Sequence, residues 1–255
     1  MPRYVIVTSG LIIVLATALS LTVVKIISFV WLGVIIATAL AVMSIGAFRV
    51  DLNLFIKAKN KSGKESAVAL TFDDGPLPGH TEKLLDILQE QNVKASFFFI
   101  GHRVQQNPEL VYRALKEGHV IGSHSYWHKW NFGFQSSDRV TREISLTSEK
   151  IKSIIGFAPR FFRPPFGVTN PFIAKAVERT NVVTIGWSMR SLDTITKDKE
   201  KLMNRIRKTK EGDIILFHDY CGITLEILPR FISELKERGM KFETLDKFLE
   251  EKAYA

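Results

Sequence analysis

A long apolar stretch at the start of the chain limits what the chain can fold into. Between Tyr4 and Phe48 the only charged side chain is Lys25. One membrane span needs about 20 residues at about 1.5 Å rise each, so one straight helix here would be about twice as long as the hydrocarbon core is thick. The stretch therefore predicts two membrane spans, Tyr4–Val24 and Ile26–Phe48, with a turn at Lys25.

Two other interpretations of this stretch remain open. Arg3, the apolar run Val5–Leu15 and the small residues Ala16–Ala18 resemble a cleavable signal peptide. Even then, the second apolar run, which ends at Phe48, would keep the protein anchored in the membrane. The remaining alternative is a buried helical hairpin within a soluble fold. Membrane attachment is the interpretation that the composition favours.

The composition changes abruptly after residue 50. We predict a membrane anchor over residues 1–50, a lysine-rich juxtamembrane linker over residues 51–66 and a catalytic domain over residues 67–255. The net charge of +9 divides almost equally, because residues 67–255 hold 28 basic and 24 acidic side chains and so contribute +4. No basic stripe with interleaved aromatic residues is present, so nucleic acid is not an expected partner.

From residue 67 onward, short β-rich runs alternate with helical runs, which predicts seven βα units and a parallel sheet, either open or closed into a barrel. The expected strands are Val68–Phe72, Ala95–Ile100, Val120–Ser123, Arg160–Arg163, Val182–Trp187, Asp213–Phe217 and Met240–Glu243. The expected helices are Thr81–Gln91, Pro108–Glu117, Asp138–Ile155 with Asp138 as N-cap, Pro171–Thr180, Lys199–Lys208, Thr224–Arg238 and Leu245–Lys252.

Polar side chains follow five of these strands. Active sites of barrel enzymes collect at the carboxyl ends of the strands, so this distribution is typical of a barrel enzyme. The residues concerned are Asp73, Asp74, His124, His128, Arg163, Asp193, His218 and Asp219.

Two histidines four residues apart suggest a metal site. His124 and His128 would lie on one helical face or face each other across a tight turn, so both can reach one ion. With a carboxylate, either Asp73 or Asp74, they would form a set of two histidines and one carboxylate that suits Zn²⁺ or another divalent ion with open positions for water. The alternative is a helix face with two surface histidines.

The combined motifs resemble those of a known family. Four motifs occur in order: Thr71-Phe-Asp-Asp-Gly-Pro76, His124-Ser-Tyr-Trp-His128, Arg163-Pro-Pro-Phe-Gly167 and Ile215-Leu-Phe-His-Asp219. Over Ala67–Lys252 the chain is similar to the polysaccharide deacetylase family, the chitooligosaccharide deacetylase or carbohydrate esterase 4 homology domain. The resemblance implies a distorted (β/α)7 barrel and hydrolysis of N-acetyl, sometimes O-acetyl, groups on sugars. It also implies one divalent metal ion, usually Zn²⁺ and sometimes Co²⁺ or Ni²⁺.

The resemblance also implies roles for individual residues. Asp74, His124 and His128 match the metal ligands of the family. Asp73 matches the general base, and His218 matches the general acid that protonates the leaving amine. Amide hydrolysis needs an activated water and a proton for the amine, so these roles agree with the chemistry.

Four further residues complete the implied site. Arg163 resembles the arginine that orients the base, and Asp193 is the expected partner of His218 or Arg163. The backbone N–H of Phe166 would help to hold the oxyanion, and Leu216 would line the acetyl pocket. Well-placed oxyanion donors are each worth about 3–4 kcal/mol.

The chain departs from the family pattern after the fifth strand. The family often shows an Asp-x-x-Asp-Trp signature, whereas this chain has Arg190-Ser-Leu-Asp-Thr194. Asp193 is kept, but Arg190 replaces the first acid and Thr194 replaces the tryptophan, which affects substrate preference more than catalysis. Other aromatic residues that could stack on a sugar are Trp127, Trp130 and Trp187.

Several remaining residues are not expected to act in catalysis. The metal constellation accounts for more residues than a nucleophilic Cys221 would, so we do not predict a thiol mechanism. Structural roles are expected for the other histidines, His80, His102 and His119.

Three functions remain as hypotheses. The first is a membrane-anchored, metal-dependent deacetylase of an N-acetylated glycan such as peptidoglycan, a chitin-like oligomer or poly-N-acetylglucosamine. The second is a deformylase or deacetylase of a lipid-linked aminosugar, and the third is a non-catalytic glycan-binding descendant. The expected location is a bacterial-type cell membrane. Positive residues flank both spans and favour cytoplasmic ends, but acetylated polymers lie outside, so we favour an extracytoplasmic domain.

Overall fold

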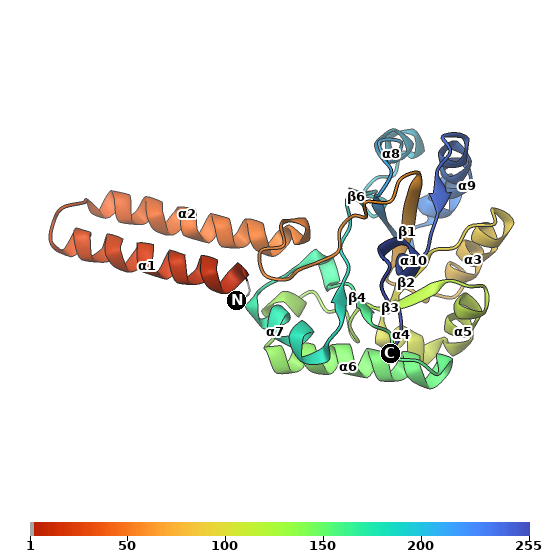
Figure 1. Ribbon diagram of the computed structural model, residues 1–255, viewed down its shortest axis with the longest axis horizontal. Helices are drawn as coiled ribbons and strands as arrows, with labels where there is room; N and C mark the ends of the chain where they lie inside the picture. The colour runs from red at the N-terminus through yellow and green to blue at the C-terminus, as the bar shows by residue number, and fades with distance from the viewer. Residues whose placement is uncertain (1–2) are drawn as a thin grey trace.

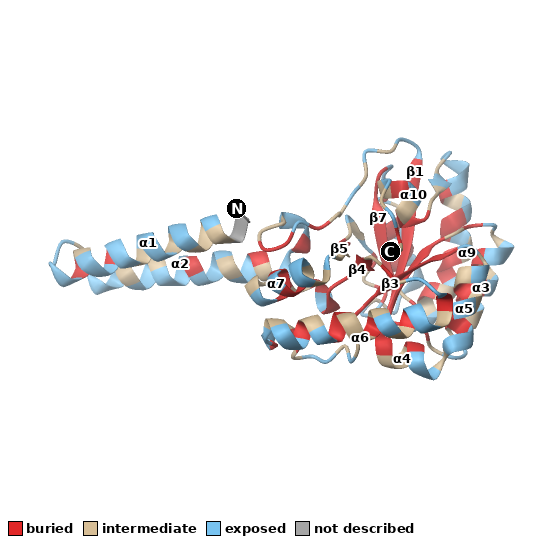
Figure 2. Cartoon of the chain, turned by 60° about the horizontal axis from the view of Figure 1, so that its bottom comes forward, coloured by how far each residue is buried: buried red, intermediate tan, exposed pale blue. Residues whose placement is uncertain are grey.

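The computed structural model describes residues 3–255, and an antiparallel helical hairpin projects from one side of it (Figure 1). α1 (Arg3–Val23) and α2 (Phe29–Phe48) are joined by a short turn in which Lys25 has φ 60°. Both helices are long and apolar enough to cross a membrane, and most of their residues are exposed (Figure 2). The structure therefore confirms the two predicted helices and the turn at Lys25.

The end of α2 is tied to the rest of the protein. The backbone N–H of Thr169 donates to the carbonyl of Ala47 at 2.9 Å, and the Thr169 hydroxyl donates to the carbonyl of Gly46 at 3.3 Å. The last carbonyls of a helix have no partner within the helix, so they need donors from outside it. Thr169 supplies two of these donors and fixes the end of α2 against the βα domain.

The segment predicted as a linker also packs against that domain. After the short 3-10 helix Val50–Leu52, the side chains of Phe55 and Ile56 are buried. They join an apolar cluster with residues of the domain, including Phe132 and Ile173. Farther on, Lys59 forms an isolated parallel bridge with Ile185. Residues 50–59 thus follow the surface of the domain.

The centre of the domain is a parallel sheet of eight strands with the order β5-β4-β3-β2-β1-β7-β6, and β8 pairs with the start of β1. Its strands are β1 (Ala67–Asp73), β2 (Ser96–Phe99), β3 (Val120–Ser123), β4 (Phe161–Phe162), β5 (Val183–Thr184), β6 (Met189–Arg190), β7 (Ile214–His218) and β8 (Lys241–Phe242). Within the described chain β5 and β6 form the two ends of this order, so the sheet is a half-barrel. The expected distorted barrel is confirmed in this open form, and β6 is a strand that the sequence did not predict.

Helices cover the outside of the half-barrel (Figure 1). They are α3 (Thr81–Glu90), α4 (Gly101–Gln106), α5 (Pro108–Lys116), α6 (Ser137–Ile155), α7 (Pro171–Thr180), α8 (Lys199–Ile206), α9 (Gly222–Glu237) and α10 (Leu245–Leu249). All seven predicted helices are present, and α4 is an additional one. The predicted N-cap Asp138 is wrong, because the Ser136 hydroxyl accepts from the N–H of Arg139 and caps α6 two residues earlier.

Alternation along β1 positions the catalytic side chains. Successive side chains of a strand point to opposite faces. Leu70 and Phe72 belong to the core between the sheet and the outer helices, where Phe72 stacks on Phe97 and Phe217. Thr71 and Asp73 point into the half-barrel instead. The buried strands stand out in the middle of the domain in Figure 2.

Candidate active site

The carboxyl ends of the strands meet around one cavity of about 410 Å³. Asp73, the last residue of β1, lies beside His218 of β7 and Phe98 of β2 in the sheet register. The cavity is lined by Asp73, Asp74, Ile100, Arg103, His124, His128, Phe166, Gly167, Trp187, Arg190, Thr194, Leu216, His218 and Tyr220. Seven of the nine predicted site residues are in this lining. The other two, Arg163 and Asp193, lie behind it and contact Asp73 and His218.

Asp74 lies between the two histidines of the predicted metal site. Its Oδ1 is 3.4 Å from His124 Nε2 and 3.3 Å from His128 Nε2. The three candidate ligand atoms all lie within 4.8 Å of one another. The histidines meet across a tight turn rather than on a helix, because Ser125 and His128 have positive φ angles of 64° and 49°. Of the two open alternatives for this motif, the structure shows the turn.

The chemistry of these three residues fits a divalent cation. Asp74 Oδ1 is buried and has no hydrogen-bond partner among the described residues. His124 Nδ1 lies 2.7 Å from the carbonyl of Arg163, which makes Nδ1 the protonated nitrogen and leaves the Nε2 lone pair free. Burial lowers the pKa of His124, and it lowers the pKa of His128 to about 4. Both imidazoles are therefore neutral at pH 7, as metal ligands must be.

Asp73 is held by a buried guanidinium. Arg163 Nη1 donates to Asp73 Oδ1 at 2.7 Å and to the Thr71 hydroxyl at 2.8 Å. Arg163 Nη2 donates to the carbonyl of Gly186 at 2.8 Å, and the side chain is fully buried. Burial raises the pKa of Asp73 although the charge of Arg163 opposes this effect. The structure therefore gives Asp73 the orienting contact that the resemblance implied.

His218 is held by a second buried carboxylate. His218 Nδ1 lies 2.8 Å from Asp193 Oδ1, and the backbone N–H of His218 donates to Asp193 Oδ2 at 2.7 Å. The hydroxyls of Ser191 and Thr224 also donate to Asp193. Burial alone would lower the pKa of His218, but the hydrogen bond and charge of Asp193 outweigh it, so the pKa is raised. Of the two expected partners of Asp193, the structure shows His218.

Phe166 and Leu216 both line the cavity. Phe166 belongs to the 3-10 turn Pro165–Gly167 and has φ 58°, and its ring centroid lies 4.6 Å from that of His128. Leu216 lies on β7 two residues before His218 and is buried. Both residues border the space where a substrate group would lie.

The positions that depart from the family pattern also reach this cavity. Arg190, Thr194 and Trp187 line it. The Arg190 guanidinium lies 5.9 Å from the Trp187 ring centroid, so a cation occupies the position of the usual acid. Trp127 and Trp130 are not in the lining. Trp127 stacks on His102 with ring centroids 5.5 Å apart, and only Trp187 of the three tryptophans borders the cavity.

Arg103 was missed by the sequence reasoning, and Asp219 was placed at a strand end but was given no role. Arg103, on α4, donates from Nη1 to the backbone carbonyl of Asp74 at 2.6 Å. Asp219 lies behind the first motif, where it accepts from the Thr81 hydroxyl at 2.6 Å and burial raises its pKa to about 7. A Cβ on Gly75 would overlap Asp219, so only glycine allows this close approach. Arg103 follows β2, so the strand-end rule could have identified it.

Residues without an expected catalytic role have structural environments. His119 Nδ1 accepts from the N–H of Ala95 at 3.1 Å, and burial lowers its pKa to about 3. Cys221 is buried, and burial raises the pKa of its thiol, which disfavours the reactive thiolate. These observations agree with the interpretation of both residues as non-catalytic.

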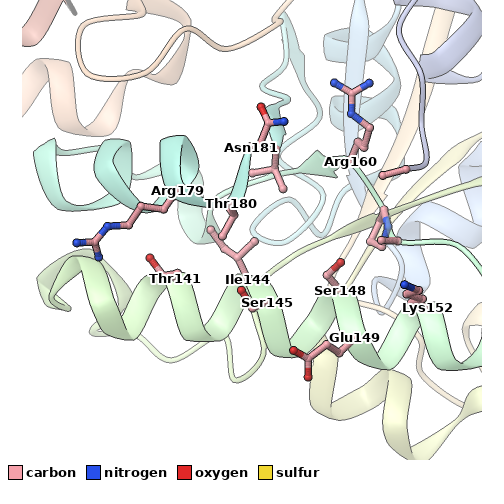
Figure 3. A pocket seen from close by; sticks show the side chains of 14 residues that line it. Thr141, Ile144, Ser145, Ser148, Glu149, Lys152, Arg160, Arg179, Thr180 and Asn181 are labelled. Atoms are coloured by element: carbon pink, nitrogen blue, oxygen red, sulfur yellow. The ribbon is translucent and has the colours of Figure 1, made fainter.

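A second hollow, of about 430 Å³, lies between α6 and α7 (Figure 3). Its lining includes Thr141, Ser148, Glu149 and Lys152 of α6, and Arg179 and Asn181 at the end of α7. None of the predicted site residues lines it. The predicted chemistry therefore belongs to the cavity at the strand ends.

Comparison with known proteins agrees with the family resemblance noted in the sequence. The polysaccharide deacetylase family model matches residues 60–185. The chain is 37% identical over 191 residues to a peptidoglycan-N-acetylglucosamine deacetylase of Bacillus cereus, covering 72% of this chain and 89% of that protein. It is 33% identical over 194 residues to the peptidoglycan-N-acetylmuramic acid deacetylase PdaA of Bacillus subtilis, covering 74% of this chain and 73% of that protein.

Solved structures show the same similarity. A peptidoglycan N-acetylglucosamine deacetylase structure aligns with a TM-score of 0.73 and 32% identity, covering 77% of this chain and 94% of that one. A structure from Bacillus anthracis, described as a CE4 family pseudoenzyme, aligns with a TM-score of 0.69 and 28% identity, covering 74% and 68% of the two chains. The strand order, the strand-end cavity and these similarities lead to one conclusion. The chain belongs to the polysaccharide deacetylase family.

Proposed function

We propose that this protein is a membrane-anchored, metal-dependent deacetylase that hydrolyses the acetamide group of amino sugars in peptidoglycan. Both Bacillus relatives are named as peptidoglycan deacetylases, which supports this substrate class. The observation that carries the proposal is the grouping of Asp74, His124 and His128 beside Asp73 and His218 in one cavity.

In this proposal, Asp74, His124 and His128 hold one divalent cation, with Zn²⁺ preferred over Co²⁺ or Ni²⁺. Such an ion supplies Lewis-acid activation of a water molecule and of the acetyl carbonyl near neutral pH. The fixed Nε2 lone pair of His124 and the unpartnered oxygen of Asp74 support this assignment.

Asp73 and His218 divide the proton transfers. Asp73 accepts a proton from the attacking water, and Arg163 keeps its carboxylate in position through the contact of 2.7 Å. His218 donates a proton to the departing amine, and its raised pKa favours the protonated form that can donate. The Phe166 N–H serves as oxyanion donor, and Leu216 limits the space to a small acyl group.

Because one similar structure is described as a pseudoenzyme, family membership does not establish catalysis by itself. A non-catalytic descendant is the runner-up. It would be expected to lack at least one of the metal ligands or proton-transfer residues, and this chain retains all five, which are Asp73, Asp74, His124, His128 and His218.

We further propose that α1 and α2 span a bacterial cell membrane and that the domain faces outward. The length and apolar composition of the helices support the spans, and the location of peptidoglycan supports the outward side. Protease accessibility of the domain in intact cells tests the side. Cleavage only after lysis would contradict it and favour a lipid-linked aminosugar as substrate.

The function is tested with the full chain in detergent. The protein is stripped with a chelator and reloaded with Zn²⁺, Co²⁺ or Ni²⁺, and acetate release is measured from peptidoglycan fragments. We expect activity to disappear with the metal and return on reloading. Acetate or formate release from a lipid-linked aminosugar alone would select the second hypothesis, and inactivity on all substrates despite bound metal would select the pseudoenzyme.

A further inference from the structure

An apolar groove of about 670 Å³ lies where α2 meets the catalytic domain. One wall comes from the C-terminal half of α2 and is formed by Leu40, Met43, Ser44, Ala47 and Phe48. The other wall comes from the domain and is formed by Phe55, Trp130, Gly133, Phe134, Phe166, Val168, Asn170 and Pro171. Phe166 also lines the catalytic cavity, so this one residue borders both spaces.

The domain wall of the groove exposes large aromatic side chains. Trp130 is 82% exposed and Phe134 is 87% exposed, and Phe166 and Phe172 nearby are more than half exposed. Clustered apolar side chains of this size mark an interaction surface, and tryptophan is enriched where proteins meet the membrane interface.

The α2 wall indicates where the groove lies relative to the hydrocarbon core of the membrane. α2 has 20 residues, which gives about 30 Å and matches the hydrocarbon core. Leu40 therefore lies about 12 Å before the end of the helix at Phe48, within one leaflet. Because Thr169 fixes the end of α2 to the domain, the aromatic wall stays beside this part of the span.

The lining of the groove suits a hydrocarbon chain. Among the described residues that line the groove, none is charged. Burying a charge away from water is costly unless the charge is paired, so an uncharged lining fits an acyl chain.

From this placement we infer that the groove binds an acyl chain of a bilayer phospholipid. The chain would lie between α2 and the ring of Trp130, with its headgroup toward the C-terminal end of α2 at Phe48. This inference rests on the proposed membrane anchoring. It deepens the proposed function, because only Phe166 then separates the lipid from the catalytic cavity, so the cavity opens at the headgroup layer.

The test uses tryptophan quenching by phosphatidylcholine with brominated acyl chains, because bromine quenches only at short range. The full chain is reconstituted in vesicles of this lipid and of its unbrominated form. In the reporter protein, Trp31→Phe and Trp127→Phe leave Trp130 and Trp187. Subtracting the spectrum of the same protein with Trp130→Phe isolates the signal of Trp130.

Two matched proteins serve as controls. In the first, Trp31 is kept and Trp130→Phe and Trp127→Phe are introduced, so that Trp31 at the start of α2 reports on the span. In the second, Phe157→Trp places a reporter after the far end of α6, in a protein that lacks Trp31, Trp127 and Trp130. We expect Trp130 to be quenched as strongly as Trp31, with no quenching at position 157. Phe134→Glu should reduce the quenching of Trp130, and Phe157→Glu should not.

The other outcomes overturn the inference in different ways. If Trp31 is quenched and Trp130 is not, the spans are embedded in the bilayer but lipid does not occupy the groove. Quenching at all three positions would mean unspecific adsorption of the domain. Blue-shifted but unquenched Trp130 emission would mean that protein, such as a second copy of the chain, covers the groove. Absence of quenching at Trp31 would contradict the membrane anchor itself.

Discussion

Arg163 Nη1 lies 2.7 Å from Asp73 Oδ1, and both side chains are almost completely shielded from solvent. The Arg163 guanidinium also contacts the Phe98 ring from one side, with its carbon 4.2 Å from the ring centroid. Burying a charged pair is costly unless its remaining hydrogen-bonding groups are also satisfied. Here Arg163 donates to the Thr71 hydroxyl and to the Gly186 carbonyl as well. The position of the base therefore depends on a fully enclosed cation.

Replacing this cation should destabilise the fold as well as reduce catalysis. Arg163→Met leaves the Asp73 carboxylate buried without its partner, and such a loss costs about 3–5 kcal/mol. We expect a decrease of this size in the free energy of unfolding, measured by denaturant titration with circular dichroism. The double variant with Asp73→Asn should recover part of the stability but none of the activity. Equal stability of the single and double variants would contradict the pairing.

The metal site should depend on each of its three ligands. His128→Ala should lose most of the bound metal and the activity, because a site with three protein ligands has little redundancy. Elemental analysis of the purified full chain measures the metal, and acetate release measures the activity. His102→Ala is the matched control, since His102 stacks on Trp127 and lies outside the ligand cluster. Stoichiometric metal in the His128→Ala protein would disprove the assignment.

The two proton-transfer roles can be separated by the leaving group. Asp73→Asn and His218→Ala should each lose at least about a hundredfold in kcat with nearly normal metal content. The double variant should be little worse than the poorer single variant, because groups that act as one unit are not additive. On an activated acetyl ester, whose leaving group needs no proton, the kcat of His218→Ala should recover and the kcat of Asp73→Asn should not. Equal losses on the ester and on an N-acetyl sugar would exclude His218 as the acid.

The Asp193 carboxylate should control the alkaline side of the pH profile. His218 must be protonated to donate, so activity falls as the pH rises through its pKa, which Asp193 holds above the usual value. In Asp193→Asn the charge is lost while burial, which lowers the pKa, remains. The alkaline limb of kcat should therefore move to lower pH. Thr224→Val, which removes one hydrogen bond to Asp193, should move it less. An unchanged limb in Asp193→Asn would show that this carboxylate does not set the pKa of His218.

The segment after α2 should contribute to stability. Phe55 and Ile56 are buried against the domain, and burial of such side chains is worth about 1.5–3 kcal/mol each. A chain that begins at residue 53 should therefore unfold at a higher denaturant concentration than a chain that begins at residue 58. Both should keep their metal, because all ligands lie beyond residue 67. Equal midpoints would mean that these contacts do not stabilise the domain.

The strongly patterned elements could be predicted from the sequence. The two apolar helices and the seven predicted βα units carry a composition or an alternation of apolar runs that indicates their secondary structure. β6 and α4 were missed because Met189–Arg190 and Gly101–Gln106 each contain a single apolar side chain, Met189 or Val104, and so carry no apolar run or periodic pattern. The contacts of Phe55 and Ile56 were missed because two apolar residues within a lysine-rich segment indicate a linker more than a packed segment.

The candidate site also could be predicted only in part from the sequence. Strand-end position identified the residues around the cavity, because parallel strands bring their carboxyl ends together. Sequence could not show which tryptophan borders the cavity, since the orientations of Trp127, Trp130 and Trp187 depend on loop geometry. It also could not show which residue pairs with Asp193, because His218 and Arg163 both lie at strand ends that border the cavity and the order of the strands in the sheet was not known.

With the proposed membrane anchor, the two hydrogen bonds from Thr169 to the last turn of α2 determine how far from the bilayer the protein can act. A domain on a flexible tether would sample a hemisphere of space above its anchor. A domain fixed to the end of a spanning helix keeps its catalytic cavity at nearly constant height over the bilayer. Encounters with substrate would then come from lateral diffusion in two dimensions. Glycan strands beyond that thin layer would stay acetylated however many copies of the protein the membrane holds.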